Sequence, residues 1–146
     1  MKIKMTFRDK DFEVDREINK KIYAGLTSDV AGQKQDEIIR FYLSNRDKFF
    51  SNELIDFLNS TGIDVTKENE ILYYTIDDNQ MIIEGWYDVV GKVLNNERVV
   101  SFFWGDELYT INIYFGDDLR QGIYPDFGGY ETFRFDFSIL VQKDKI

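Results

Sequence analysis

The chain begins with alternating apolar and polar residues, the pattern of a strand with one buried face. Residues 2–7 and 12–15 both alternate, and the polar segment Arg8-Asp9-Lys10-Asp11 lies between them. A period of two is typical of a β-strand, and a short polar connection between two such segments is typical of a turn. The N-terminus therefore predicts a β-hairpin.

From about Gln33 the apolar residues recur at helical spacing instead. The residues expected to share one face of this helix are Ile38, Phe41, Tyr42 and Phe49. A second, shorter helix should follow, because Ser51 is a suitable N-cap and Gly62 is a suitable stop. Its buried side chains are expected to be Leu54, Ile55, Phe57 and Leu58.

Residues 65–80 are compatible with two structures. The run from Ile71 to Ile76 fits a strand, and it also fits the end of a third short helix that begins at Thr66. Of the two we favour the strand. The Asp77-Asp78-Asn79 cluster after it lacks the ligand spacing of a calcium-binding loop, so it is interpreted as a turn.

The C-terminal half predicts an antiparallel meander. Strands are expected at 81–94, 98–104, 108–115 and 131–141, and Gly85 and Gly91 interrupt the first of them as in a bent strand. The last strand alternates most regularly. Its core-facing side chains are expected to be Phe133, Phe135, Phe137, Ile139 and Val141, and its solvent-facing side chains Thr132, Arg134, Asp136 and Ser138.

Together these elements predict an α+β fold with an N-terminal β-hairpin, two helices and then a four- to five-stranded antiparallel sheet. The length of 146 residues fits a single domain over 1–146, and 43% apolar with 31% charged residues is typical of a globular chain. The sequence contains no apolar run that could cross a bilayer and no signal-peptide core at Met1. We therefore expect a cytoplasmic protein that does not bind membranes.

The residue types exclude several kinds of chemistry. The chain has no cysteine and no histidine, so disulfides, zinc–thiolate sites, imidazole ligands and hydrolase triads with a histidine base are all excluded. No glycine-rich phosphate-binding motif occurs either. We expect no cofactor, no metal and no catalytic residue of these kinds.

Negative charge is concentrated in the middle of the chain. The formal net charge is −9, and residues 51–131 hold sixteen Asp or Glu against four Lys or Arg. An excess of carboxylates generally keeps a protein soluble. It also fits a negative electrostatic field that attracts a basic partner. Direct binding to nucleic acid is not expected, because no stripe of Lys and Arg is present.

The connection 116–130 is the segment that most invites a functional interpretation. It is much longer than the other connections within the predicted sheet, and long connections in compact domains are often functional. Aromatic side chains beside acids suit an interface that receives Arg or Lys, whereas packing under the sheet is the structural alternative. The candidate partner-binding residues are Asp117, Asp118, Tyr124, Asp126, Phe127 and Tyr130, with Asp106 and Glu107 in a neighbouring turn.

The functional hypothesis is an acidic binding protein that occludes a basic protein partner. An immunity protein or an inhibitor of a bacterial toxin, such as a nuclease, fits this description. One alternative is a carboxylate-based hydrolase or carbohydrate-binding domain that uses the loop acids with Trp86 and Trp104. A second alternative is a structural subunit of a larger assembly. The sequence leaves the partner and the oligomeric state open.

Overall fold

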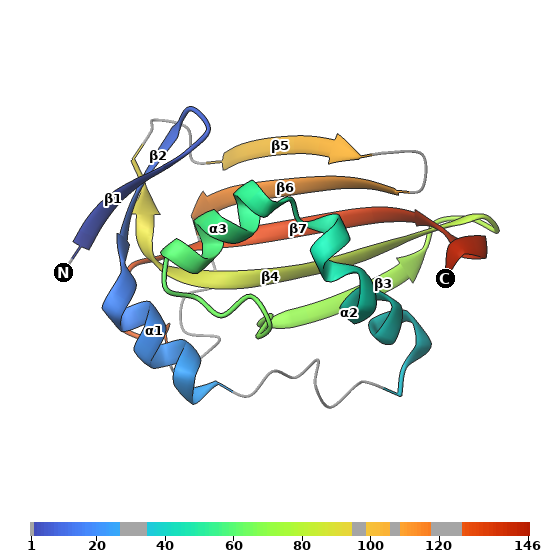
Figure 1. Cartoon of the computed structure of the whole chain (residues 1–146), viewed down its shortest axis with the longest axis horizontal. Helices are drawn as coiled ribbons and strands as arrows, with labels where there is room; N and C mark the ends of the chain where they lie inside the picture. The colour runs from blue at the N-terminus through green and yellow to red at the C-terminus, as the bar shows by residue number, and fades with distance from the viewer. Residues whose placement is uncertain (1, 27–34, 95–98, 106–108, 118–126) are drawn as a thin grey trace.

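The computed structural model describes residues 2–26, 35–94, 99–105, 109–117 and 127–146. Three α-helices and seven strands occur in these ranges (Figure 1). The helices are α1 (Arg16–Gly25), α2 (Glu37–Phe49) and α3 (Asn52–Ser60), and a short 3-10 helix, η3 (Lys143–Lys145), follows the last strand. The strands are β1 (Lys2–Phe7), β2 (Lys10–Asp15), β3 (Glu70–Thr75), β4 (Gln80–Val93), β5 (Val99–Gly105), β6 (Tyr109–Asp117) and β7 (Thr132–Gln142).

The strands form one antiparallel sheet in the order β1-β2-β4-β7-β6-β5, and β3 also pairs with β4. Strand β4 is long enough to have two different partners along one edge: β3 lies beside residues 81–86 and β2 beside residues 91–93. Along its other edge β4 pairs with β7 over eleven consecutive positions, from Gln80 opposite Gln142 to Val90 opposite Thr132. The α+β class and the N-terminal hairpin are confirmed, and residues 70–75 form the favoured strand.

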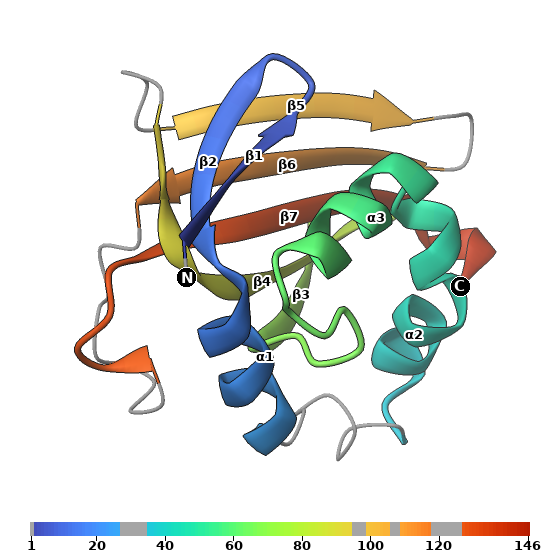
Figure 2. The ribbon, with the colours of Figure 1, turned by 60° about the vertical axis from the view of Figure 1, so that its left-hand side comes forward.

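Helices α2 and α3 cover one face of the sheet, which we call the inner face (Figures 1 and 2). The predicted alternation of β7 places Phe133, Phe135 and Phe137 on this face, where all three are buried. The ring of Phe137 stacks on Tyr42 of α2 at 5.6 Å, and the ring of Phe115 on the neighbouring strand β6 lies 5.6 Å from Phe57 of α3. Aromatic packing between the helices and the sheet is therefore the centre of the core.

The close approach of β2 to β4 depends on Gly91. A Cβ atom there would lie 2.2 Å from the carbonyl oxygen of Glu13, and the φ angle of Gly91 is +151°. Glycine tolerates both conditions because it has no side chain. Strand β4 therefore pairs with β3 up to Trp86 and with β2 from Gly91 onward, where the sequence predicted a bend.

Helix α1 is an element that the sequence did not predict. Asp15 caps it by accepting a hydrogen bond from the amide of Ile18, but its buried residues are Asn19 and Tyr23 rather than aliphatic side chains. A helix is identified in a sequence chiefly by apolar residues at helical spacing. A helix that buries an asparagine and a tyrosine instead shows little of this periodicity.

Helix α1 completes the edge of β4 between its two partner strands. The Asn19 amide oxygen accepts from the Val90 amide at 2.8 Å, and its nitrogen donates to the Val90 carbonyl at 3.2 Å. The Tyr23 hydroxyl donates to the Asp88 carbonyl at 2.6 Å, while the side chain of Asn69 accepts from the Asp88 amide at 2.7 Å. Side chains thus satisfy the backbone groups that no described strand reaches, as buried polar groups require.

We expect Asn19→Ala to destabilise the fold strongly. The substitution would leave the buried N–H and C=O of Val90 without a partner, at about 1–3 kcal/mol for each group. Chemical denaturation measures the loss, and Asn59→Ala on the exposed surface of α3 is the matched control that should change little. Equal stability of the two variants would contradict the assigned role of Asn19.

Candidate functional site

The candidate residues from the sequence lie only partly within the described structure. Asp106, Glu107, Asp118, Tyr124 and Asp126 lie outside the described residues, and Asp117 is the last residue of β6. Phe127 is buried and packs edge-on against Tyr23 of α1 at 5.8 Å, so it has the packing role that the sequence left open. Tyr130 is exposed.

Tyr130 lies at a concavity of about 250 Å³ between the first hairpin, α1 and the start of β7. Three acids line this concavity: Glu13, Asp15 and Glu131. Two of them already have partners, because Lys2 and Lys92 both approach Glu13 and Asp15 caps α1. Tyr130 is thus the candidate residue at this concavity, and the three acids beside it come from β2 and from the residue before β7, not from the candidate set.

The opposite side of the sheet, which we call the outer face, provides a second acidic and aromatic surface. Cross-strand pairs share a face, and the register places Trp86 opposite Asp136 and Asp136 opposite Tyr114. In the next row Glu84 lies opposite Ser138. The carboxylate of Asp136 is thus flanked on the neighbouring strands by two aromatic residues.

These residues line a shallow concavity of about 250 Å³ in the middle of the outer face. Glu84, Tyr114, Asp136 and Ser138 are all half-buried, and the described helices lie on the opposite face of the sheet (Figures 1 and 2). The Tyr74 hydroxyl on β3 extends this surface by donating to Glu84 Oε1 at 3.0 Å. We refer to Tyr74, Glu84, Tyr114, Asp136 and Ser138 together as the acidic face.

Beyond the acidic face, one end of the outer face is buried, which corrects the expectation of a wholly solvent-facing side. Thr132 and Arg134 were expected to face solvent, yet both are buried. Burial of Arg134 is tolerated because Asp88, directly opposite on β4, accepts from its guanidinium Nε at 3.0 Å and Nη2 at 3.5 Å. A buried guanidinium needs such a partner.

The ring of Trp86 is partly covered by the same guanidinium, which lies 4.7 Å from the ring centroid. Trp86 is itself buried, so one ring face is occupied by a cation and little of the ring is available to a sugar. This arrangement favours a packing role for Trp86. Trp104 lies in β5, opposite Ile111.

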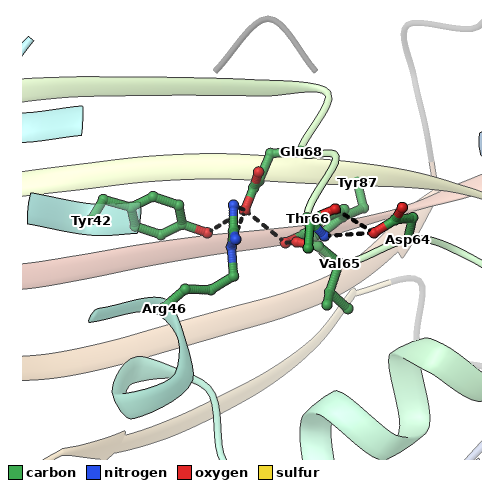
Figure 3. Close-up of polar contacts among 7 residues, drawn as sticks. All are labelled: Tyr42, Arg46, Asp64, Val65, Thr66, Glu68 and Tyr87. Carbon is green, nitrogen blue, oxygen red and sulfur yellow. Dashed lines mark hydrogen bonds and ion pairs between the residues drawn. The ribbon is translucent and has the colours of Figure 1, made fainter. Parts of the chain in front are cut away.

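A buried polar cluster on the inner face joins α2 to the segment before β3 (Figure 3). The Glu68 carboxylate accepts from Arg46 Nε at 2.5 Å and from the Tyr42 hydroxyl at 2.8 Å. The Tyr87 hydroxyl lies 2.7 Å from the Val65 carbonyl oxygen and 3.1 Å from Glu68 Oε1. Because Glu68, Tyr42 and Tyr87 are all buried, this cluster holds elements together and is not exposed to a ligand.

Burial raises the pKa values of Tyr42 and Tyr87 well above the ordinary value for tyrosine, and the negative charge of Glu68 raises them further. Both hydroxyls therefore stay protonated and act as hydrogen-bond donors at neutral pH. At the surface, the hydrogen bond from Tyr73 and the backbone amides of Ile38 and Ile39 lower the pKa of Asp36. Asp36 is thus a stable negative charge beside β3.

The described residues contain no group of three or more Asp or Glu placed to hold a metal ion. No α-helix in the described part of the chain is long and apolar enough to cross a membrane. Comparison with protein-family models, with curated proteins and with solved structures found no match for this chain.

The acidic face was not among the candidate residues from the sequence. Its signal was present in the alternation of the predicted strands, because Asp136 and Glu84 occupy positions opposite in phase to the buried residues. Only the register between β4, β7 and β6 shows that these acids and Tyr114 are neighbours. Strand pairing over a long sequence separation is not visible in a single sequence.

We expect stability to fall above about pH 10, because the unfolded chain then loses tyrosine protons that the folded protein retains. Each such tyrosine contributes a slope of about −1.4 kcal/mol per pH unit. Tyr42→Phe should remove one of these contributions, so that the free energy of unfolding falls less steeply with pH. The variant also loses the hydrogen bond to Glu68, which lowers its stability at neutral pH. Denaturation at several alkaline pH values measures the slope. An unchanged slope in this variant would contradict the assignment.

Proposed function

We propose that the protein binds a basic protein partner through the acidic face and blocks that partner's activity. An immunity protein or an inhibitor of a bacterial toxin works in this way, and the cytoplasm is the expected compartment. The observation that carries the proposal is the placement of Glu84 and Asp136 among the aromatic side chains Tyr74 and Tyr114, on the face of the sheet opposite the described helices. Aromatic residues provide contact area, and carboxylates select Lys and Arg.

The charge distribution supports the same proposal. Residues 68–91 contain no Lys or Arg, and this stretch supplies β3 and most of β4. Of its six acids, Glu68 and Asp88 are buried against Arg46 and Arg134, and the other four are Glu70, Asp77, Asp78 and Glu84. On the outer face Arg134 is buried against Asp88, and Lys92, near the end of β4, lies 4.0 Å from Glu13. A negative field of this kind steers a basic protein toward the surface.

A hydrolase is the second candidate, since two carboxylates share one concavity. Glu84 and Asp136 are diagonal neighbours on adjacent strands, a relation that spans roughly 7–8 Å. Inverting glycosidases use carboxyl groups at about this separation. However, the volume of about 250 Å³ is below the roughly 300–1,000 Å³ of typical ligand pockets. Binding of a protein is therefore the better interpretation.

We expect the double variant Glu84→Gln with Asp136→Asn to capture at least tenfold less partner from a native lysate than the parent protein does. The loss of two charge-assisted contacts accounts for such a factor. The matched control is Glu17→Gln with Asp144→Asn, which removes the same two charges from exposed positions on α1 and η3. Quantitative mass spectrometry of captured proteins, with melting temperatures of all baits, is the measurement.

Equal capture by the parent and both double variants would overturn the proposal, as would equal losses in the two variants. Hydrolysis of oligosaccharides by the parent and its loss in Glu84→Gln alone would favour the second candidate instead. A structural subunit would co-purify in a fixed stoichiometry that does not depend on Glu84 or Asp136.

A further inference from the structure

Strand β3 has an edge that no described strand occupies. In an antiparallel pair, hydrogen-bonded and non-hydrogen-bonded positions alternate. The amide of Ile76 donates to the carbonyl of Gln80, so Tyr74 and Leu72 are the next hydrogen-bonded positions toward β4. The N–H and C=O groups of Tyr73 and Thr75 consequently point away from β4.

The side chains beside this edge are large, apolar and exposed. Leu72, Tyr73 and Tyr74 are 45%, 40% and 48% exposed, and Ile76 after the strand is 50% exposed. Natural edge strands usually carry Lys, Pro or a bulge that prevents pairing with another chain. Strand β1, at one end of the same sheet, carries exposed Lys2 and Lys4, whereas β3 has no Lys or Pro.

We propose that β3 is a docking edge to which the basic partner adds an extended strand. This inference rests on the proposed function and specifies how the partner is recognised. Main-chain hydrogen bonds to Tyr73 and Thr75 would provide affinity, and alternate side chains of the added strand would provide specificity, as in other cases of strand addition.

Charge complementarity determines what kind of strand fits. Glu70 lies at one end of β3, and Asp77 and Asp78 lie in the turn at the other end. Asp36 accepts a hydrogen bond from the Tyr73 hydroxyl at 2.5 Å, which places another carboxylate beside the middle of the strand. An added strand with Lys or Arg at alternate positions would meet these acids. A second copy of this chain would instead bring like charges together.

Amide hydrogen exchange followed by NMR tests the proposal with an internal control. The probe is a blocked peptide of about ten residues in which Lys and Val alternate, added at up to about millimolar concentration. The amides of Tyr73 and Thr75 should exchange rapidly in the free protein and at least tenfold more slowly with the peptide. The amides of Leu72 and Tyr74 should be protected in both states, because they bond to β4.

Two comparisons, one between peptides and one between protein variants, test whether the protection depends on main-chain hydrogen bonds. The same peptide N-methylated at every residue keeps its charge and side chains but has no backbone donors, so it should give no protection. Thr75→Pro removes an outward N–H without breaking the β3–β4 ladder and should abolish the effect, while Thr75→Ala should retain it. An absence of protection at Tyr73 and Thr75 with the peptide, or protection that persists in Thr75→Pro, would overturn strand addition.

The outcomes also separate this inference from the proposed function. If the lysate partner still depends on Glu84 and Asp136 but binds Thr75→Pro as well as Thr75→Ala, strand addition is wrong and the acidic face remains the site. Protection that increases with protein concentration in the absence of peptide would assign the edge to a second copy of this chain and overturn the inference.

Discussion

The pairing of β4 with β7 is the constraint on which the rest of this structure depends. Eleven consecutive cross-strand pairs fix which side chains of both strands face the helices and which face away. A shift by one residue would turn Phe135 and Phe137 out of the core and turn Arg134 and Asp136 into it. The same register that buries the aromatic core therefore also creates the acidic face on the other side.

Buried polar groups connect the remaining elements to this pair of strands. Asn19 and Tyr23 fix α1 to the edge of β4, and the pair formed by Arg46 and Glu68 fixes α2 to the segment that leads into β3. Loss of any one partner would lower the stability of the fold, because it would leave a buried polar group without a hydrogen bond. Strand β3 itself has an edge that no described strand occupies, with exposed apolar side chains beside the acidic face.

The sequence predicted the elements that obey a simple period and missed those that depend on distant partners. Alternation identified the buried face of β7, and helical spacing with the Ser51 cap identified α2 and α3. Helix α1 was missed because it buries Asn19 and Tyr23, whose hydrogen-bond partners are 42 to 71 residues away in sequence. The burial of Arg134 and the gathering of Asp136 with Glu84 were missed for the same reason: both depend on strand register.

The central claim is that the partner docks on the side of the sheet opposite the described helices, along β3 and the acidic face. Site-specific photocrosslinking in cells tests it most directly, with a photoreactive phenylalanine derivative placed at Tyr74 or Tyr114 and, as controls, at exposed Arg40 of α2 or Asn59 of α3. The account expects the same covalent adduct from Tyr74 and Tyr114 and none from the helix positions. An adduct that forms only from Arg40 or Asn59 would contradict it.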